Sequence, residues 1–483
     1  MGGGLLQLTI EGQMNIPLFY NPQISFFNYA YKKHTNFAME SIIHNFDNGV
    51  LSISDMHNAG YYTVKLTENP NVDLLASVYL IFKLPDVYSD DKFKFKWVEN
   101  IGSLLIKNAS IHIDNTEIDN ITGEWLVVWN ELSLPVKDGY NNMTGNIPEL
   151  TNPRKKETVY RIRNNILSEF DYASSDKSDI NNPSIKGRYI SVPLPFWFSK
   201  NQSLALPILK FCTNHHVYLK IQFENIENLY TVYSDIYNMN ISPMYYNELN
   251  RPNKISINDF IINKNLIAHI DATFIVLDCY ERQLIINNAY KEYLIETTRI
   301  NKQPFISGGI DSIRTIDVPS QLLVKEIIWT LNRADSIYKF NDILNYSYSI
   351  PRNNENSIMK TALILWDKNT ERVNEKDAYF YNNIQPYQYH SIIPRQGIYC
   401  YTFSLMPEKW FPSGCYNGAG IGTQLIIKLN NYEPSLIDKL YFDKFNKNYN
   451  MKIENNDIII TIYTIQYNIL VIQSGKAKLK IQN

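Results

Sequence analysis

Short runs in which apolar and polar side chains alternate recur along this chain, and they constrain its fold more than any other feature. In residues 217–223 (VYLKIQF) every odd-numbered residue is apolar, whereas the even-numbered residues are Tyr, Lys and Gln. Because successive side chains of a β-strand point to opposite faces, this pattern is typical of a half-buried antiparallel strand. Comparable runs lie at 61–66, 77–82, 109–114, 274–280, 424–429 and 461–472. The most apolar stretch, 458–472, is interrupted by Thr, Gln and Asn, so we predict a strand there and not a membrane span.

Helical patterns are scarce. The clearest one begins after Thr122, a residue that can cap a helix, and ends before Pro135. Trp125 and Trp129 are four residues apart and therefore share one face of this helix. We expect both to be structural, on a short helix that closes one end of the first of two sandwiches. A second short helix is expected around 289–295.

Strands dominate both halves of the 483-residue chain, and neither half alternates strands with helices. This argues against a doubly wound α/β enzyme and predicts an all-β protein. Because one domain usually takes roughly 100–200 residues, the length fits two antiparallel sandwiches in tandem with long loops. We expect their junction at 224–266, a segment rich in Asn, Tyr and Ser. Residues 1–24 are expected to form an N-terminal arm, and its first part, 1–13, with three glycines and several leucines, should not order by itself. The alternative is that Leu5 to Ile10 fold back on their own jelly roll.

Charge and cysteine usage exclude several classes of protein. Lys and Arg number 46 against 48 Asp and Glu, so the basic excess that a nucleic-acid surface needs is missing. No sequence-specific nucleic-acid partner is therefore expected.

The chain has four cysteines that lie far apart without a CxxC pair: Cys212, Cys279, Cys400 and Cys415. We expect reduced, mostly buried thiols in a cytosolic compartment. The N-terminus lacks the basic and apolar regions of a signal peptide.

Motifs that would carry catalysis are weak. The sequence SGGIDS at Ser307–Ser312 matches the phosphate loop of adenylating ATP pyrophosphatases, but such a loop needs a helix after it. Pro319 and several β-branched residues follow instead, which favours a turn between strands. His215 and His216 are adjacent, so on a strand they face opposite sides and cannot both bind one metal. His390 is expected to be structural. We predict no catalytic, cofactor-binding or metal site.

Several segments, in order along nearly the whole chain, carry a family resemblance. After the opening MGGGLLQL they are Asn21–Ile42, Trp97–Leu132, Val192–Leu209, Leu277–Glu296, Ile327–Asn332 and Tyr379–Gly414. Together they resemble the major capsid protein family of large nucleocytoplasmic DNA viruses. Any one of these segments is weak, whereas the ordered set is highly specific.

The resemblance implies a double jelly roll, which is two tandem antiparallel eight-stranded sandwiches with a few short helices in long loops. It divides the chain into an N-terminal arm (1–24), a first jelly roll (25–225) and a second jelly roll (226–483). It further implies a structural, non-enzymatic protein whose homotrimers form pseudo-hexagonal capsomers of an icosahedral shell in the virion. The implied partners are neighbouring capsomers, minor capsid and penton proteins and, through the arm, an internal membrane, with assembly in the host cytoplasm.

Two other functions stay open from the residues alone. Lectin and hydrolase sandwiches share the strand pattern, so the alternative is a two-domain β-sandwich that binds or hydrolyses glycans. Hydrolysis needs paired carboxylates at a fixed separation, and no local motif indicates such a pair. The third option is an adenylating enzyme built on Ser307–Ser312. Departures from the family pattern at Tyr20, Lys32–Lys33 and 415–422 (CYNGAGIG) leave open an abundant shell protein or a divergent paralogue.

Overall fold

A computed structural model describes residues 3–481, apart from a set of positions and segments outside the described structure. These are 11, 13–15, 29–30, 48, 50, 55, 57–59, 70, 155–171, 212–214, 235–238, 251, 289, 307–312, 321, 350–356, 431–456 and 474. The chain separates into two compact units, Met1–Phe37 and Ala38–Asn483. The small unit contains α1 (Gly3–Thr9) and α2 (Ile16–Phe19), and no residue of α1 is buried.

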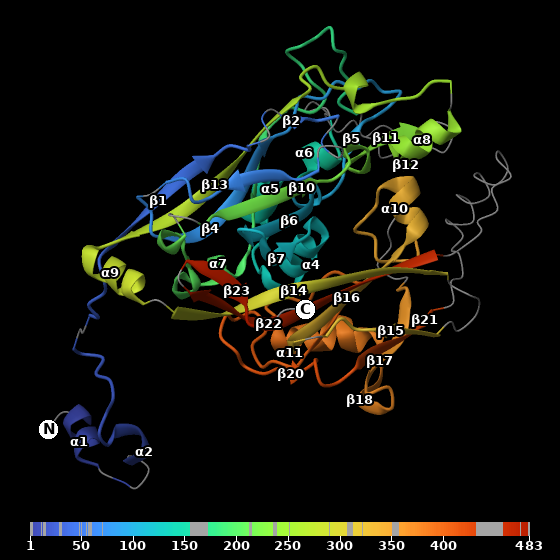
Figure 1. Cartoon of the computed structure of the whole chain (residues 1–483). Coiled ribbons are helices and arrows are strands. Elements are labelled where there is room, and N and C mark those ends of the chain that lie inside the picture. The colour runs from blue at the N-terminus through green and yellow to red at the C-terminus, as the bar shows by residue number, and fades with distance from the viewer. Residues whose placement is uncertain are drawn as a thin grey trace. The chain divides into compact units, whose positions relative to one another are not determined.

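The first half of the large unit is a sandwich of two antiparallel sheets (Figure 1). One sheet has the order β1 (Phe37–His44), β13 (Asn265–Leu277), β4 (Leu74–Lys83), β8 (Tyr189–Pro193), with β2 (Leu51–Ser52) beside β13 and β9 (Leu206–Pro207) beside β4. The facing sheet has the order β3 (Tyr62–Lys65), β10 (Val217–Phe223), β6 (Ile106–Ile113), β7 (Thr116–Ile121). A small third sheet joins β12 (Met239–Ile241), β11 (Tyr230–Ser234) and β5 (Lys96–Trp97).

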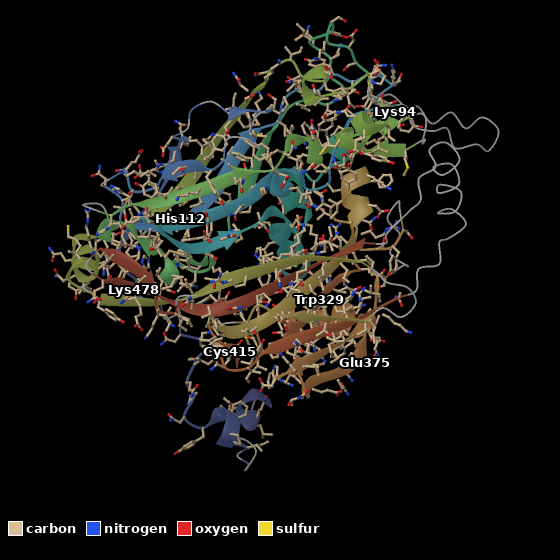
Figure 2. The ribbon with its side chains drawn as sticks, turned by 45° about the vertical axis from the view of Figure 1, so that its right-hand side comes forward. Lys94, His112, Trp329, Glu375, Cys415 and Lys478 are labelled. Carbon is tan, nitrogen blue, oxygen red and sulfur yellow. The ribbon has the colours of Figure 1, made fainter. Side chains whose placement is uncertain are left out.

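The second half is a sandwich of the same kind. Its larger sheet has the order β14 (Tyr290–Ile306), β22 (Asp457–Gln473), β16 (Leu323–Arg333), β19 (Ile398–Thr402), with β20 (Tyr416–Asn417) and β23 (Lys476–Leu479) attached. The facing sheet has the order β15 (Ile313–Asp317), β21 (Thr423–Leu429), β17 (Met359–Trp366), β18 (Thr370–Asp377). Trp329, labelled in Figure 2, lies in the second sandwich. It is fully buried between these two sheets and stacks on Tyr399.

The strand order is identical in the two halves. When the eight principal strands of each half are numbered along the chain, one sheet reads 1-8-3-6 and the other reads 2-7-4-5. Such an order, in which the last strand returns to lie beside the first, defines the jelly roll. The expected all-β double jelly roll is therefore confirmed. The alternation that predicted strands is also visible in β10, where buried and half-buried residues alternate from Val217 to Phe223.

The eighth strand of the first jelly roll lies beyond the expected domain boundary. β13 pairs with β4 over nine residue pairs from Ile267–Lys83 to Ile275–Leu74, which places 265–277 in the first sandwich and not in a second domain that starts at 226. The expected junction at 224–266 instead carries β11, β12 and α8 (Pro243–Leu249). The sequence of a strand that follows a long loop does not indicate which sheet the strand joins, so the expected boundary lies too early. We propose that the first jelly roll ends just after Leu277.

The helices are short and lie mostly in the connections. They are α3 (Ile101–Leu104), α4 (Gly123–Ser133), α5 (Asp138–Thr144), α6 (Pro148–Thr151), α7 (Trp197–Lys200), α9 (Cys279–Asn287), α10 (Ala334–Phe340), α11 (Gln385–Tyr389), the π-helix Phe380–Ile384 and the 3-10 turns Gln202–Leu204, Ile208–Lys210, Ile226–Asn228 and Ile257–Asp259. The prediction of a helix at 289–295 is wrong, because residues from Tyr290 onward form β14, which pairs with β22 along its full length. A helix, α9, lies just before this strand. It is capped by Asp278, whose side chain accepts a hydrogen bond from the Glu281 N–H. Within the described residues, no helix has the length and apolar character needed to cross a membrane.

A tight approach between α4 and the preceding segment gives a first prediction. A Cβ added at Gly123 would lie 2.0 Å from the Ser103 carbonyl oxygen and 2.6 Å from that of Ile106. The variant Gly123→Ala must therefore push two backbone segments apart, and we expect it to lower the free energy of unfolding by at least about 1–3 kcal/mol in denaturant titrations. Gly139→Ala, in α5 with open space around the added carbon, is the matched control and should be neutral or slightly stabilising. Equal effects of the two variants would contradict this packing.

Candidate functional site at the seam between the two sandwiches

The two jelly rolls meet along a buried seam, and α4 is one of its main parts (Figure 1). The Thr122 side chain accepts a hydrogen bond from the Trp125 N–H at 3.3 Å, as the sequence predicted. Trp125 is buried and its ring centroid lies 5.1 Å from that of Tyr463 in β22 of the second sandwich. Trp129 is partly buried against the same core and lies 5.5 Å from Trp125. The helix is structural, but it joins both sandwiches and does not simply close one end of the first.

Apolar packing is continuous across the seam. The hydrophobic cluster that fills the first sandwich extends to Ile295, Ile328, Cys400 and Tyr463, which lie on β14, β16, β19 and β22. The other face of the same sheet packs into the second sandwich's own core. This sheet is thus covered on both faces, and β16 is buried at every residue after Leu323. A strand that is covered on both faces loses the alternating pattern, because nearly all of its residues are buried.

A buried ion network crosses the seam. Glu296 of β14 pairs with Lys200 of α7, from the first sandwich, and with Lys325 of β16. The Lys325 side chain is fully buried and that of Glu296 is 7% exposed. A break in the β16–β22 register between Val324 and Glu326 turns Lys325 toward this network. Burial alone would raise the pKa of Glu296, but the two lysines lower it below its usual value.

Ion pairs at the margin of the seam add further cross-links. Arg395, in the loop before β19, lies 2.7 Å from Glu131 at the end of α4 and 3.5 Å from Glu99. Lys302 of β14 lies 2.8 Å from Glu124 at the start of α4. Partly exposed pairs of this kind contribute roughly 0–1 kcal/mol each. They join α4 and the segment around Glu99 to strands and loops of the second sandwich.

A polar cavity of about 670 Å³ opens at the seam between β7 and the β14–β22 pair. Asp119 lies on its wall, and burial raises the pKa of this carboxyl to about 7, although the Asn120 N–H and Lys200 act in the opposite direction. The folded state therefore holds its proton over a pH range in which the unfolded chain has released it. Such a group lowers stability as pH rises from about 4 to about 7, and the loss then levels off.

Asp119→Asn removes this ionisation while keeping an oxygen that can accept the Asn120 N–H. Because one pKa unit corresponds to about 1.4 kcal/mol, we expect the variant to be stabilised, by about 2–3 kcal/mol more at pH 8 than at pH 5. Denaturant unfolding at the two pH values measures this difference. Asp367→Asn, at an exposed turn, is the control. A stability difference that does not change with pH would contradict the burial of a neutral Asp119.

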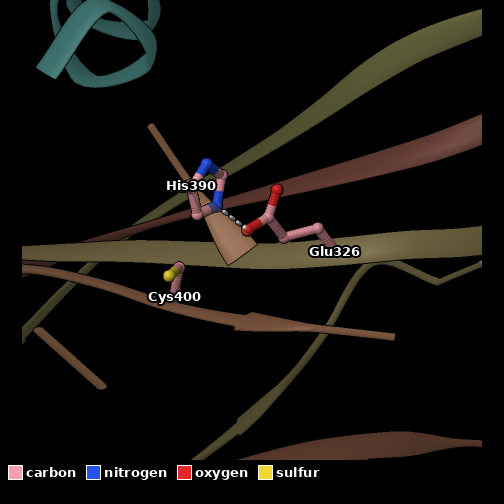
Figure 3. A group of neighbouring side chains, drawn as sticks. All are labelled: Glu326, His390 and Cys400. Carbon is pink, nitrogen blue, oxygen red and sulfur yellow. Dashed lines mark hydrogen bonds and ion pairs between the residues drawn. The ribbon is translucent and has the colours of Figure 1, made fainter. Parts of the chain in front are cut away.

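A second polar cluster lies on the seam-facing side of β16 and β19 (Figure 3). His390 follows α11, and its Nε2 lies 2.6 Å from Oε1 of Glu326. Its Nδ1 lies 3.2 Å from Oε1 of Glu408, which also accepts the Ser391 N–H at 2.7 Å. Burial would lower the pKa of His390, but Glu326 and the surrounding hydrogen bonds raise it to about 12. The buried thiol of Cys400 completes the group.

The structure separates the other residues that the sequence singled out. His215 pairs with Asp114 at 2.6 Å, whereas His216 lies 3.2 Å from the Thr67 hydroxyl, so the two histidines serve different partners. Ser307–Ser312 and Cys212 lie outside the described residues. Mostly buried thiols were expected, but Cys279 and Cys415 are exposed and only Cys400 of the three described cysteines is buried. Cys279 begins α9, a helix in which no residue is buried.

Comparisons with known proteins agree with this architecture. The family model "Major capsid protein N-terminus" matches residues 25–257, and the model "Large eukaryotic DNA virus major capsid protein" matches 281–478. The chain is 27% identical to probable capsid protein 4 of Acanthamoeba polyphaga mimivirus over 97% of both chains, and 25% identical to the major capsid protein of Phaeocystis pouchetii virus over the full length of both. A subunit of the PBCV-1 virus capsid matches with a TM-score of 0.67 at 19% identity, covering 95% of this chain and 100% of that one. The Faustovirus major capsid protein matches with a TM-score of 0.62 at 12% identity, over 96% and 94%.

The repeated strand order and these structural neighbours define a double jelly-roll protein of the kind that builds viral capsids. The chain belongs to the major capsid protein family of large eukaryotic DNA viruses. It is a structural, non-enzymatic protein that self-associates in the shell of an icosahedral capsid and is located in the virion. The glycan-active alternative is not supported.

Proposed function

We propose that three copies of this chain form a pseudo-hexagonal capsomer, the block from which the shell is tiled. The observation that supports this proposal is the repeat of one strand order in two sandwiches joined by a buried seam. Three chains then supply six similar sandwiches, so a three-fold symmetric block presents a nearly six-fold outline to its neighbours. A rigid seam matters here, because independent movement of the sandwiches would blur that outline.

Exposed apolar surface supports association of this kind. α9 has no buried residue, yet it carries Tyr280, Leu284 and Ile286, which are 69%, 50% and 53% exposed. The edge strand β1 exposes Phe37, Met39 and Ile43 in the same way. Removing such side chains from water yields roughly 25 cal/mol per Å² of apolar area. These surfaces suit contacts within the capsomer or between neighbouring capsomers.

The mass of the purified full-length protein tests the trimer. Light scattering or native mass spectrometry should give three times the chain mass of 56.3 kDa. Tyr280→Ser combined with Leu284→Ser should weaken association without unfolding the chain, whereas Tyr387→Ser, at an exposed site on α11, is the control. A protein that stays monomeric at high concentration would contradict the proposed capsomer.

The N-terminal arm is proposed to bind outside its own jelly roll. Leu5, Leu6 and Leu8 of α1 are 58%, 56% and 82% exposed, so their apolar surface is still available for burial. Its partner is a neighbouring capsomer, a minor capsid or penton protein, or an internal membrane, met during assembly in the host cytoplasm. Deleting residues 2–13 should leave trimers with nearly unchanged melting but stop shell assembly. A melting temperature lowered by many degrees would show that the arm belongs to the fold.

A further inference from the structure

We propose that Glu326, His390 and Cys400 form a buried binding site for one zinc ion per chain. The three residues come from β16, the loop after α11, and β19, and one ligand atom of each lies within 4.8 Å of the others (Figure 3). Nothing in the capsid function requires this site, so the proposal goes beyond that function.

The donor set selects the class of metal. One thiol sulfur, one imidazole nitrogen and one carboxylate oxygen are the ligands that zinc takes in proteins, at roughly 2.0–2.3 Å. Calcium and magnesium prefer oxygen ligands alone, so the sulfur of Cys400 argues against them. The second carboxylate oxygen of Glu326, Oε2, is buried without a hydrogen-bond partner among the described residues. A buried oxygen left unpaired in this way is costly unless a ligand uses it.

The backbone holds the donors in place. Glu326 pairs with Thr402 and Ile328 pairs with Cys400 in the β16–β19 ladder, so Glu326 and Cys400 are diagonal neighbours on one face of the sheet. Both strands are buried in the described structure, which keeps their side chains in one arrangement. Zinc at this point would therefore bind a rigid pair of ligands and not a mobile loop.

The partners of His390 are those of a metal-binding histidine. Its Nδ1 faces Glu408, and the N–H of Ser391 holds that carboxylate at 2.7 Å. A carboxylate on the far nitrogen fixes the tautomer and directs the other nitrogen toward the metal. Nε2 accordingly points to Glu326, on the side where Cys400 lies.

Charges and protons balance when zinc enters. The Nε2–H of the imidazolium and the Sγ–H of Cys400 break, both protons pass to solvent, and bonds from zinc to nitrogen, sulfur and a Glu326 oxygen form. The hydrogen bond between Nε2 and Glu326 is given up. The dication is then matched by one thiolate and one carboxylate, so the buried group stays neutral, as it was with imidazolium and Glu326 before. A water molecule can take the fourth position.

Cobalt substitution in the full-length protein tests the site. Metal-free protein titrated with Co²⁺ should show a sulfur-to-cobalt charge-transfer band that saturates at one ion per chain, and Zn²⁺ should abolish it. The triple variant Cys212→Ser, Cys279→Ser and Cys415→Ser, which keeps only Cys400, should retain the band. Cys400→Ser should lose it and weaken Zn²⁺ binding by more than about 100-fold, whereas Glu408→Gln should weaken binding by about 10–100-fold.

Two results would overturn the proposal. One is the absence of a saturable band in the unaltered protein, a measurement that does not depend on how any variant folds. The other is a band that disappears in the triple variant, which would assign the thiolate to another cysteine. If Cys400→Ser does not fold, the unaltered protein and the triple variant together still decide the matter.

Discussion

Replacing Trp125 by alanine should lower the free energy of unfolding by about 3–5 kcal/mol. The ring is 5% exposed and packs between Trp129 of its own helix and Tyr463 of the second sandwich, tilted by 32° and 33° to these two rings. Its removal leaves a cavity that rigid strands on both sides cannot close. Because the cavity lies between the sandwiches, the variant should also unfold in two separate transitions where the unaltered protein unfolds in one.

Trp410→Ala is the matched control for this prediction. Trp410 lies in a surface loop before Phe411 and is 39% exposed, so its truncation should cost well under about 1–2 kcal/mol. Calorimetry and denaturant titration of the two variants provide the comparison. Similar losses in both variants would contradict the view that α4 carries a large share of the seam.

The second large effect is expected from the ion network of Glu296. Glu296→Gln removes the carboxylate that pairs with both Lys200 and the fully buried Lys325, and breaking a buried pair in this way costs about 3–5 kcal/mol. The double variant Glu296→Gln with Lys325→Met should recover a good part of the loss, because it removes the more deeply buried lysine. The two single effects should therefore not add.

The exposed pair of Glu375 and Lys428 gives the control for the ion network. Its atoms lie 2.7 Å apart, and the side chains are 40% and 35% exposed (Figure 2 labels Glu375). Glu375→Gln should cost less than about 1 kcal/mol. If Glu296→Gln and Glu375→Gln lower the free energy of unfolding equally in denaturant titrations, burial of the network does not contribute to stability.

Strand content was predictable from the sequence because it depends on local alternation. The runs at 217–223 and 461–472 are strands β10 and most of β22, and the capped helix after Thr122 is α4. Their prediction requires only the period of the apolar residues, a residue that caps the helix and a residue that ends it. The order of the strands in the sheets depended on the family resemblance, since alternation says which residues form strands but not which strands pair.

What the sequence could not give depends on contacts between distant segments. Residues Tyr290–Ile295 look helical in isolation, but β22 offers them a partner strand over their whole length. β13 lies beyond a long loop and still returns to the first sheet. The cluster of Glu326, His390 and Cys400 escaped notice because its members are separated by 64 and 10 residues, which is no metal-ligand spacing. The available signals were His390 and Cys400, which lie in one segment that the family resemblance covered, but nothing in the sequence linked them to Glu326.

The seam links the fold to the capsid function. Each jelly roll has its own inner core, yet the larger sheet of the second one is also buried against the first. The chain therefore consists of two similar halves joined by a shared buried seam, and α9 and the N-terminal arm are the surfaces that we propose for contact with neighbours. Residues of the seam are expected to affect stability, and residues of the exposed surfaces are expected to affect assembly.

Electron microscopy of the purified full-length protein tests the central claim most directly. Class averages should show a particle of three chains with a nearly hexagonal outline, formed by six similar lobes around a three-fold axis. This outline requires two rigidly joined sandwiches in each chain and association of the chains into a trimer. Single two-lobed particles, or rings with a number of chains other than three, would contradict the account.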